Sequence, residues 1–131
     1  MIAGTHFVFG DYDQSRPVFD ARIQRARCAL EEMEKTRSKC NNGTAVCLVC
    51  PDGLVVLTLE QEADETIDAW VLLAASTGAT GVFRQHEGAM VAIARELGAT
   101  RLTFRTDRKG WKRLLGPEWS ESGDVYSRGV S

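Results

Sequence analysis

The chain has 131 residues, 44% apolar and 26% charged, and a formal net charge of −2 at pH 7. This composition is typical of a globular protein, and the length predicts a single domain over residues 1–131. The slight negative charge argues against nucleic acid and anionic membranes as partners. No apolar run approaches membrane-spanning length and the first residues lack a secretory signal pattern, so the expected location is the cytoplasm.

The N-terminal part predicts a strand followed by a long helix. The strand is His6–Phe9, and Ser15 is expected to cap the helix, with Pro17 in its first turn. The spacing of three and four residues between apolar side chains predicts about twenty helical residues, with an inner face of Phe19, Ile23, Ala26, Leu30 and Met33. A turn at residues 41–43 ends this helix.

The middle of the chain predicts a β-hairpin and a further strand. Two apolar runs, 44–50 and 54–59, flank the turn sequence Pro-Asp-Gly at 51–53. The acidic segment 60–68 is expected to be a loop or an exposed strand end. A buried strand is expected at 70–74.

The C-terminal half predicts a loop, a helix, a strand, a short helix and a last strand, at residues 76–81, 82–97, 101–105, 111–115 and 125–129. Gly98 is expected to end the longer helix in a left-handed conformation. The complete order of elements predicts an α/β (α+β) domain with a mixed sheet and helices on both faces.

The cysteines and His86 are interpreted as structural residues. Cys47 and Cys50 form a C-x-x-C pair within a predicted strand, where residues three apart point to opposite faces and cannot share a metal ion. No histidine with ligand spacing follows Cys40, and Cys28 lies in a predicted helix. His86 lies near the apolar stripe of its helix, which is typical of a satisfied structural histidine. No metal site is therefore expected.

The segment Ala94–Gly98, the strand Arg101–Arg105, the short helix after Gly110, Trp119 and the final strand resemble the second half of the GNAT acetyltransferase superfamily. The resemblance implies a GNAT-like mixed central sheet with helices on both faces. In active members, the parallel strands corresponding to those that contain Trp70 and Arg101 separate to admit the pantetheine arm of acetyl-CoA. Acetyl-CoA is thus the expected cofactor if the chain is an enzyme, and none is expected otherwise.

The resemblance also implies where the cofactor's pyrophosphate would bind. The usual loop, Q/R-x-x-G-x-G/A, corresponds here to Gly78–Phe83, in which Gly81 matches a motif glycine and Phe83 replaces a very small residue. In a shifted register, residues 77–81 form the cradle, including Gly78, Thr80 and Gly81, and Arg84 contacts phosphate. The physical basis is the affinity of exposed backbone N–H groups and a helix N-terminus for anions.

The residues that would carry the chemistry are weakly represented. Leu114 falls near the position where many GNAT enzymes have a tyrosine that protonates the leaving thiolate. Glu60 and Glu62 are candidates for the base that deprotonates the amine, although an acidic run is also typical of a solvated rim. Tyr126 is a candidate acid, or alternatively a packed aromatic residue of the last strand.

The segment Arg108–Leu115 resembles small GNAT-like proteins of tailed bacteriophages. This resemblance implies a non-catalytic structural protein, located in the host cytoplasm or the virion, with protein partners in the particle or self-association. A basic cluster supports contact with an acidic surface; its members are Arg101, Arg105, Arg108, Lys109, Lys112 and Arg113. The alternative functions are an acyl-CoA-dependent N-acetyltransferase and, third, a nucleic-acid-binding factor.

Overall fold

The computed structural model describes residues 2–19, 30–77, 82–106 and 110–130, except for the side chains of residues 30–33, 82–84 and 112. A seven-stranded sheet lies at the centre, in the order β1-β2-β3-β4-β5-β7-β6. Its strands are β1 (Val8–Phe9), β2 (Val46–Cys50), β3 (Gly53–Gln61), β4 (Ile67–Ser76), β5 (Arg101–Arg105), β6 (Ser120–Ser122) and β7 (Val125–Gly129). Among the described strands, only β4 and β5 run parallel, so the sheet is mixed, as predicted.

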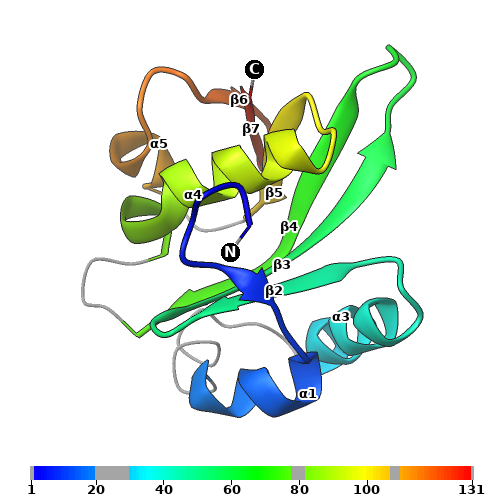
Figure 1. Ribbon diagram of the computed structural model, residues 1–131. Helices are drawn as coiled ribbons and strands as arrows, with labels where there is room; N and C mark the ends of the chain where they lie inside the picture. The colour runs from blue at the N-terminus through cyan, green and yellow to red at the C-terminus, as the bar shows by residue number, and fades with distance from the viewer. Residues whose placement is uncertain (1, 20–29, 78–81, 107–109, 131) are drawn as a thin grey trace.

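Helices cover both faces of this sheet (Figure 1). On each face, an apolar core lies between the sheet and its helices. One face carries α4 (Val82–Glu96) and α5 (Trp111–Leu114), and the other carries α1 (Tyr12–Ser15), the 3₁₀ helix η1 (Arg16–Phe19) and α3 (Leu30–Asn41). The core on the α4 side includes Leu57, Met90 and Leu102, all fully buried. The core on the α1 side includes Tyr12 and Leu54. The predicted α+β class is confirmed.

The predicted start of the first helix at Ser15 is wrong, whereas residues 20–29, which include Ile23 and Ala26 of its predicted inner face, lie outside the described residues. A short helix, α1, begins instead after Asp11, whose side chain accepts a hydrogen bond of 2.9 Å from the Gln14 backbone N–H. Ser15 ends α1, and the chain then tightens into η1, which contains Pro17. Both Asp and Ser are good caps, and the earlier start buries Tyr12 in the core. The predicted helix end is confirmed, because α3 stops at Asn41.

The β2–β3 hairpin is confirmed, but its second strand continues further than predicted. Strand β3 reaches Gln61 and β4 begins at Ile67, so the acidic segment contains two paired strand ends and a tight turn. The turn is closed by the Thr66 hydroxyl, which donates to the Asp64 carboxylate at 2.5 Å. Strand β6 was not predicted, because its three residues are exposed and polar and carry no apolar alternation.

Gly98 ends α4 as predicted, and this ending directs the chain into β5. Gly98 has a φ of 91°. Its N–H donates to the Arg95 carbonyl, and the Ala99 N–H donates to the Ala94 carbonyl at 2.9 Å, which is the Schellman arrangement. Among the described residues, no helix is long and apolar enough to cross a membrane.

Candidate functional site

Strands β4 and β5 pair over only three residues and then separate. The pairs are Asp68 with Arg101, Ala69 with Leu102, and Trp70 with Thr103. Beyond Trp70, the described part of β4 pairs only with β3, whereas β5 continues beside β7. Residues 71–75 therefore present a strand edge on the β5 side, where backbone N–H and C=O groups can bind an extended ligand. We call this region the β4–β5 fork.

A β-bulge lies in β4 just beyond the point of separation. Leu57 pairs with Val71 and Val56 pairs with Leu73, so Leu72 has no register partner in β3. A bulge bends its strand and increases the local twist. The bulge therefore turns β4 away from β5 at the residue where their pairing stops.

The last pair before the fork carries two buried polar atoms that have no hydrogen bond to any described residue. These are the indole Nε1 of Trp70 and the hydroxyl Oγ1 of Thr103, which is only 1% exposed. The guanidinium of Arg105 lies 5.9 Å from the centre of the Trp70 ring. A buried polar group without a partner costs roughly 1–3 kcal/mol, so two such groups on neighbouring strands indicate a place where a ligand supplies the missing partners.

An ion pair holds the closed end of the fork. Arg101 donates from Nε to the buried Asp68 carboxylate at 2.7 Å, and a second guanidinium nitrogen contacts both Asp68 and Thr66. The hydrogen bond from Arg101 to Asp68 raises the pKa of the guanidinium above its ordinary value. This pair fixes the register of the two parallel strands at the base of the fork.

The candidate catalytic residues do not converge on one point. Glu60 is exposed near the end of β3 and pairs with Asp68, and Glu62 is half-exposed just after that strand. Tyr126 is buried on the α4 side, where its ring stacks on Phe104 at 5.3 Å. Because Glu60 lies three residues from Leu57, which is part of the α4-side core, alternation places it on the opposite face. The structure therefore separates Tyr126 from Glu60.

Tyr126 also has a hydrogen-bond partner that makes it a poorer acid. Its hydroxyl is hydrogen-bonded to the Glu121 carboxylate, and this raises the pKa of Tyr126 above its ordinary value. Leu114, at the position where the resemblance implies a tyrosine, is 72% exposed in α5.

The candidate cofactor-binding residues fall mostly outside the described part of the chain. Gly78, Thr80 and Gly81 are not described, and Arg84 lies in the first turn of α4 with its side chain not described. Helix α4 begins at Val82. The glycine-containing segment thus precedes the N-terminus of a fifteen-residue helix, as the sequence predicts.

Two members of the predicted basic cluster, Arg101 and Arg105, form ion pairs within the chain. Arg101 is committed to Asp68, and Arg105 lies 3.5 Å from the Asp124 carboxylate as well as over Trp70. Residues 108 and 109 are not described, nor is the side chain of Lys112, whereas Arg113 is exposed. Alternation along β5 directs Arg101 and Arg105 to the Trp70 face of the sheet.

The expectations for Cys47 and His86 have different outcomes. Cys47 packs in the α1-side core and Cys50 against the α4-side core, so the C-x-x-C thiols do point to opposite faces. The interpretation of His86 as a satisfied histidine is wrong, because its buried Nε2 has no hydrogen bond in the part of the chain that the structure describes. That atom lies 3.6 Å from the Asp52 carboxylate, in the turn of the hairpin. No local signal in the sequence relates these two residues.

No protein-family model matches the sequence, and no curated protein matches it. Among solved structures, the chain is similar to a GNAT family acetyltransferase from Brucella melitensis in complex with acetyl-CoA. The TM-score is 0.68 and the identity 12%, over 96% of this chain and 88% of that one. The chain has a GNAT-like fold. At this identity, the similarity shows the fold alone.

Proposed function

We propose that the chain binds acyl-CoA in the β4–β5 fork and transfers the acyl group to an amine. The observation that carries the proposal is the separation of β4 and β5 immediately after Trp70 and Thr103, beside a bulge in β4. The pantetheine arm of coenzyme A contains two amides, which suit an unpaired strand edge. The solved GNAT family acetyltransferase of similar fold is in complex with acetyl-CoA, which supports the choice of ligand.

Three groups in or near the β4–β5 fork have separate roles in this proposal. The N-terminus of α4 attracts the pyrophosphate, because its free N–H groups and dipole favour negative charge. The Trp70 indole and the Thr103 hydroxyl supply hydrogen bonds at the closed end, where both lack partners in the described structure. Glu60 is the preferred base for the amine, because its register with Asp68 puts it on the same face as Trp70.

Calorimetric titration with acetyl-CoA tests the proposal, with Thr103→Val and Thr58→Val as matched variants. Thr103→Val removes a hydroxyl without a protein partner and should weaken binding roughly 3- to 10-fold. The Thr58 hydroxyl donates to the Thr44 carbonyl at 2.7 Å, so Thr58→Val should lower stability and leave affinity unchanged. Absence of both heat and a thermal shift at millimolar acetyl-CoA would remove the proposal.

The second candidate is a non-catalytic protein of a tailed-phage particle. It is supported by the phage-like segment, by the replacement of the motif's small residue with Phe83, and by the exposed edge strand β1. Phe9 in that strand is 62% exposed, which suits strand addition by a partner or a second copy. Mass spectrometry of purified particles and light scattering of the isolated chain test it. Absence from virions together with a monomeric chain would exclude it.

A further inference from the structure

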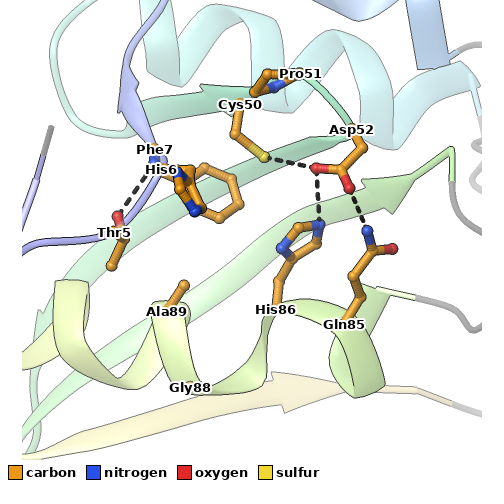
Figure 2. A pocket seen from close by; sticks show the side chains of 10 residues that line it. All are labelled: Thr5, His6, Phe7, Cys50, Pro51, Asp52, Gln85, His86, Gly88 and Ala89. Atoms are coloured by element: carbon orange, nitrogen blue, oxygen red, sulfur yellow. Dashed lines mark hydrogen bonds and ion pairs between the residues drawn. The ribbon is translucent and has the colours of Figure 1, made fainter.

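A cavity of about 660 Å³ lies between α4, the β2–β3 turn and the segment before β1. Two of its lining residues, Phe7 and Cys50, belong to or pack against the α4-side core, so the cavity lies on the α4 side of the sheet. Figure 2 shows three side chains with metal-binding atoms that point toward one another in it: Cys50, Asp52 and His86. The proposed acyl transfer uses none of them.

The three potential ligand atoms are close enough to share one ion. The Cys50 Sγ lies 3.2 Å from an Asp52 carboxylate oxygen, and the same oxygen lies 3.6 Å from the His86 Nε2. All three atoms lie within 4.8 Å of one another. In a tetrahedral zinc site, the metal–ligand bonds are about 2.0–2.3 Å long. The tetrahedral angle then places the sulfur ligand about 3.5 Å from the oxygen ligand, and the nitrogen ligand about 3.4 Å from that oxygen. The two observed separations from the Asp52 oxygen, 3.2 Å to sulfur and 3.6 Å to nitrogen, lie within about 0.3 Å of these values.

His86 supplies an independent indication of a missing ligand. The residue is only 8% exposed, and its Nε2 has no hydrogen bond within the described structure. Its other ring contact is with Phe7, whose ring meets the imidazole edge-on at 5.2 Å. A buried imidazole nitrogen aimed at a thiol and a carboxylate is costly unless a proton or a metal ion satisfies it.

Neighbouring groups hold the Asp52 carboxylate in place. The Gln85 amide donates to the second Asp52 oxygen, and the Ser76 hydroxyl donates to the Gln85 carbonyl oxygen at 2.5 Å. The Thr77 N–H donates to the Asp52 carbonyl at 3.0 Å and so fixes the turn itself. A supporting shell of this kind is characteristic of metal sites, where it orients the ligands.

We propose that Cys50, Asp52 and His86 bind a zinc ion, with the fourth coordination position open to the cavity. A thiolate and a carboxylate together balance the charge of Zn²⁺, and thiolate with imidazole is a ligand set that favours zinc over harder cations. The arrangement does not suit a nucleophilic cysteine, because the thiol donates to a carboxylate and not to the imidazole. Burial of Cys50 raises its pKa, which also argues against an activated thiolate in the metal-free protein.

Cobalt substitution of the complete, reduced and chelator-treated protein tests the site. Co²⁺ should bind at one equivalent and give the near-ultraviolet band of thiolate ligation with visible bands of tetrahedral cobalt, and Zn²⁺ should displace both. Zn²⁺ should also protect Cys50 from alkylation, as read by peptide mapping of the unmodified chain. This second readout needs no variant and therefore does not depend on whether a variant folds.

Variants then identify the ligands. His86→Gln and Asp52→Asn should each weaken zinc binding at least about 10-fold, because each removes a direct ligand. The matched control is Cys40→Ser, since this half-buried thiol lies on the other side of the sheet and should leave affinity unchanged. Absence of a thiolate band, failure of Zn²⁺ to protect Cys50, or full affinity in His86→Gln would each overturn the proposal. Acetyl-CoA binding measured with and without zinc separates this outcome from the fate of the acyltransferase.

Discussion

Trp70 and Thr103 are register partners at the last pair of the parallel β4–β5 ladder, and each buries a polar atom that has no hydrogen bond among the described residues. By contrast, the polar side chains of Asp68 and Arg101, two residues earlier in the same ladder, are hydrogen-bonded to each other in a close ion pair. The unsatisfied atoms thus lie at the point where the sheet opens. Their cost to the free protein is offset if a ligand that enters the fork accepts or donates the missing bonds.

The first prediction compares two tryptophans. Trp70→Phe removes an indole N–H that has no partner among the described residues, and this gain opposes the packing lost with the smaller ring, so the free energy of unfolding should stay within about 0.5 kcal/mol of the parent. Trp119→Phe breaks a 2.8 Å hydrogen bond to the Glu87 carboxylate and should cost about 1.5–3 kcal/mol. Urea denaturation of both variants measures the difference. Equal losses in the two variants would mean that the Trp70 indole is already satisfied in the free protein.

The second prediction concerns the ion pair at the base of the fork. Arg101→Leu leaves the 4% exposed Asp68 carboxylate without its partner and should cost about 3–5 kcal/mol. Adding Asp68→Leu should recover most of that loss, because the double variant no longer buries a charge. Thermal unfolding of the two variants checks this, and a double variant as unstable as Arg101→Leu would contradict it.

The third prediction uses two glycines that line or adjoin the cavity. A Cβ at Gly53 would lie 2.8 Å from the His86 Nε2 and 3.0 Å from the Cys50 sulfur. Gly53→Ala should therefore destabilise the protein by about 1–3 kcal/mol and displace His86.

Gly88, on α4, is the matched control. A Cβ there meets nothing within 4 Å, so Gly88→Ala should stabilise the helix by about 0.5–1 kcal/mol. Chemical denaturation gives both values, and the opposite signs are the essential result. A neutral Gly53→Ala would show that the contact with His86 is loose.

The fourth prediction is a pH dependence. Burial raises the pKa of the Cys47 thiol from its ordinary value of 9.0 to about 12. The unfolded chain therefore loses this proton first, and the free energy of unfolding should fall as the pH rises from 9.0 toward 12. Cys47→Ala should reduce that slope, as measured by urea titrations at several alkaline pH values. An unchanged slope would show that Cys47 does not cause it.

Features decided by a few neighbouring residues could be predicted from the sequence. Gly98 ends α4 because its backbone has a φ of 91°, which strains other residues, and Pro51-Asp-Gly53 closes a hairpin for similar local reasons. The alternation of Leu102 and Phe104 predicts a half-buried strand, and β5 follows it. The order of these elements was sufficient to predict a mixed α+β sheet with helices on both faces.

The candidate sites depended on contacts between distant segments. The bulge at Leu72 and the parting of β4 from β5 follow from how two strands with different partners pack, and no residue pattern within either strand encodes that separation. His86 meets Cys50 and Asp52 only because α4 docks beside the β2–β3 turn. Backbone propensity acts over a few residues, whereas convergence of side chains is set by burial of the whole apolar face of a helix. The sequence alone therefore determined the elements and their order, and the tertiary packing decided which side chains meet.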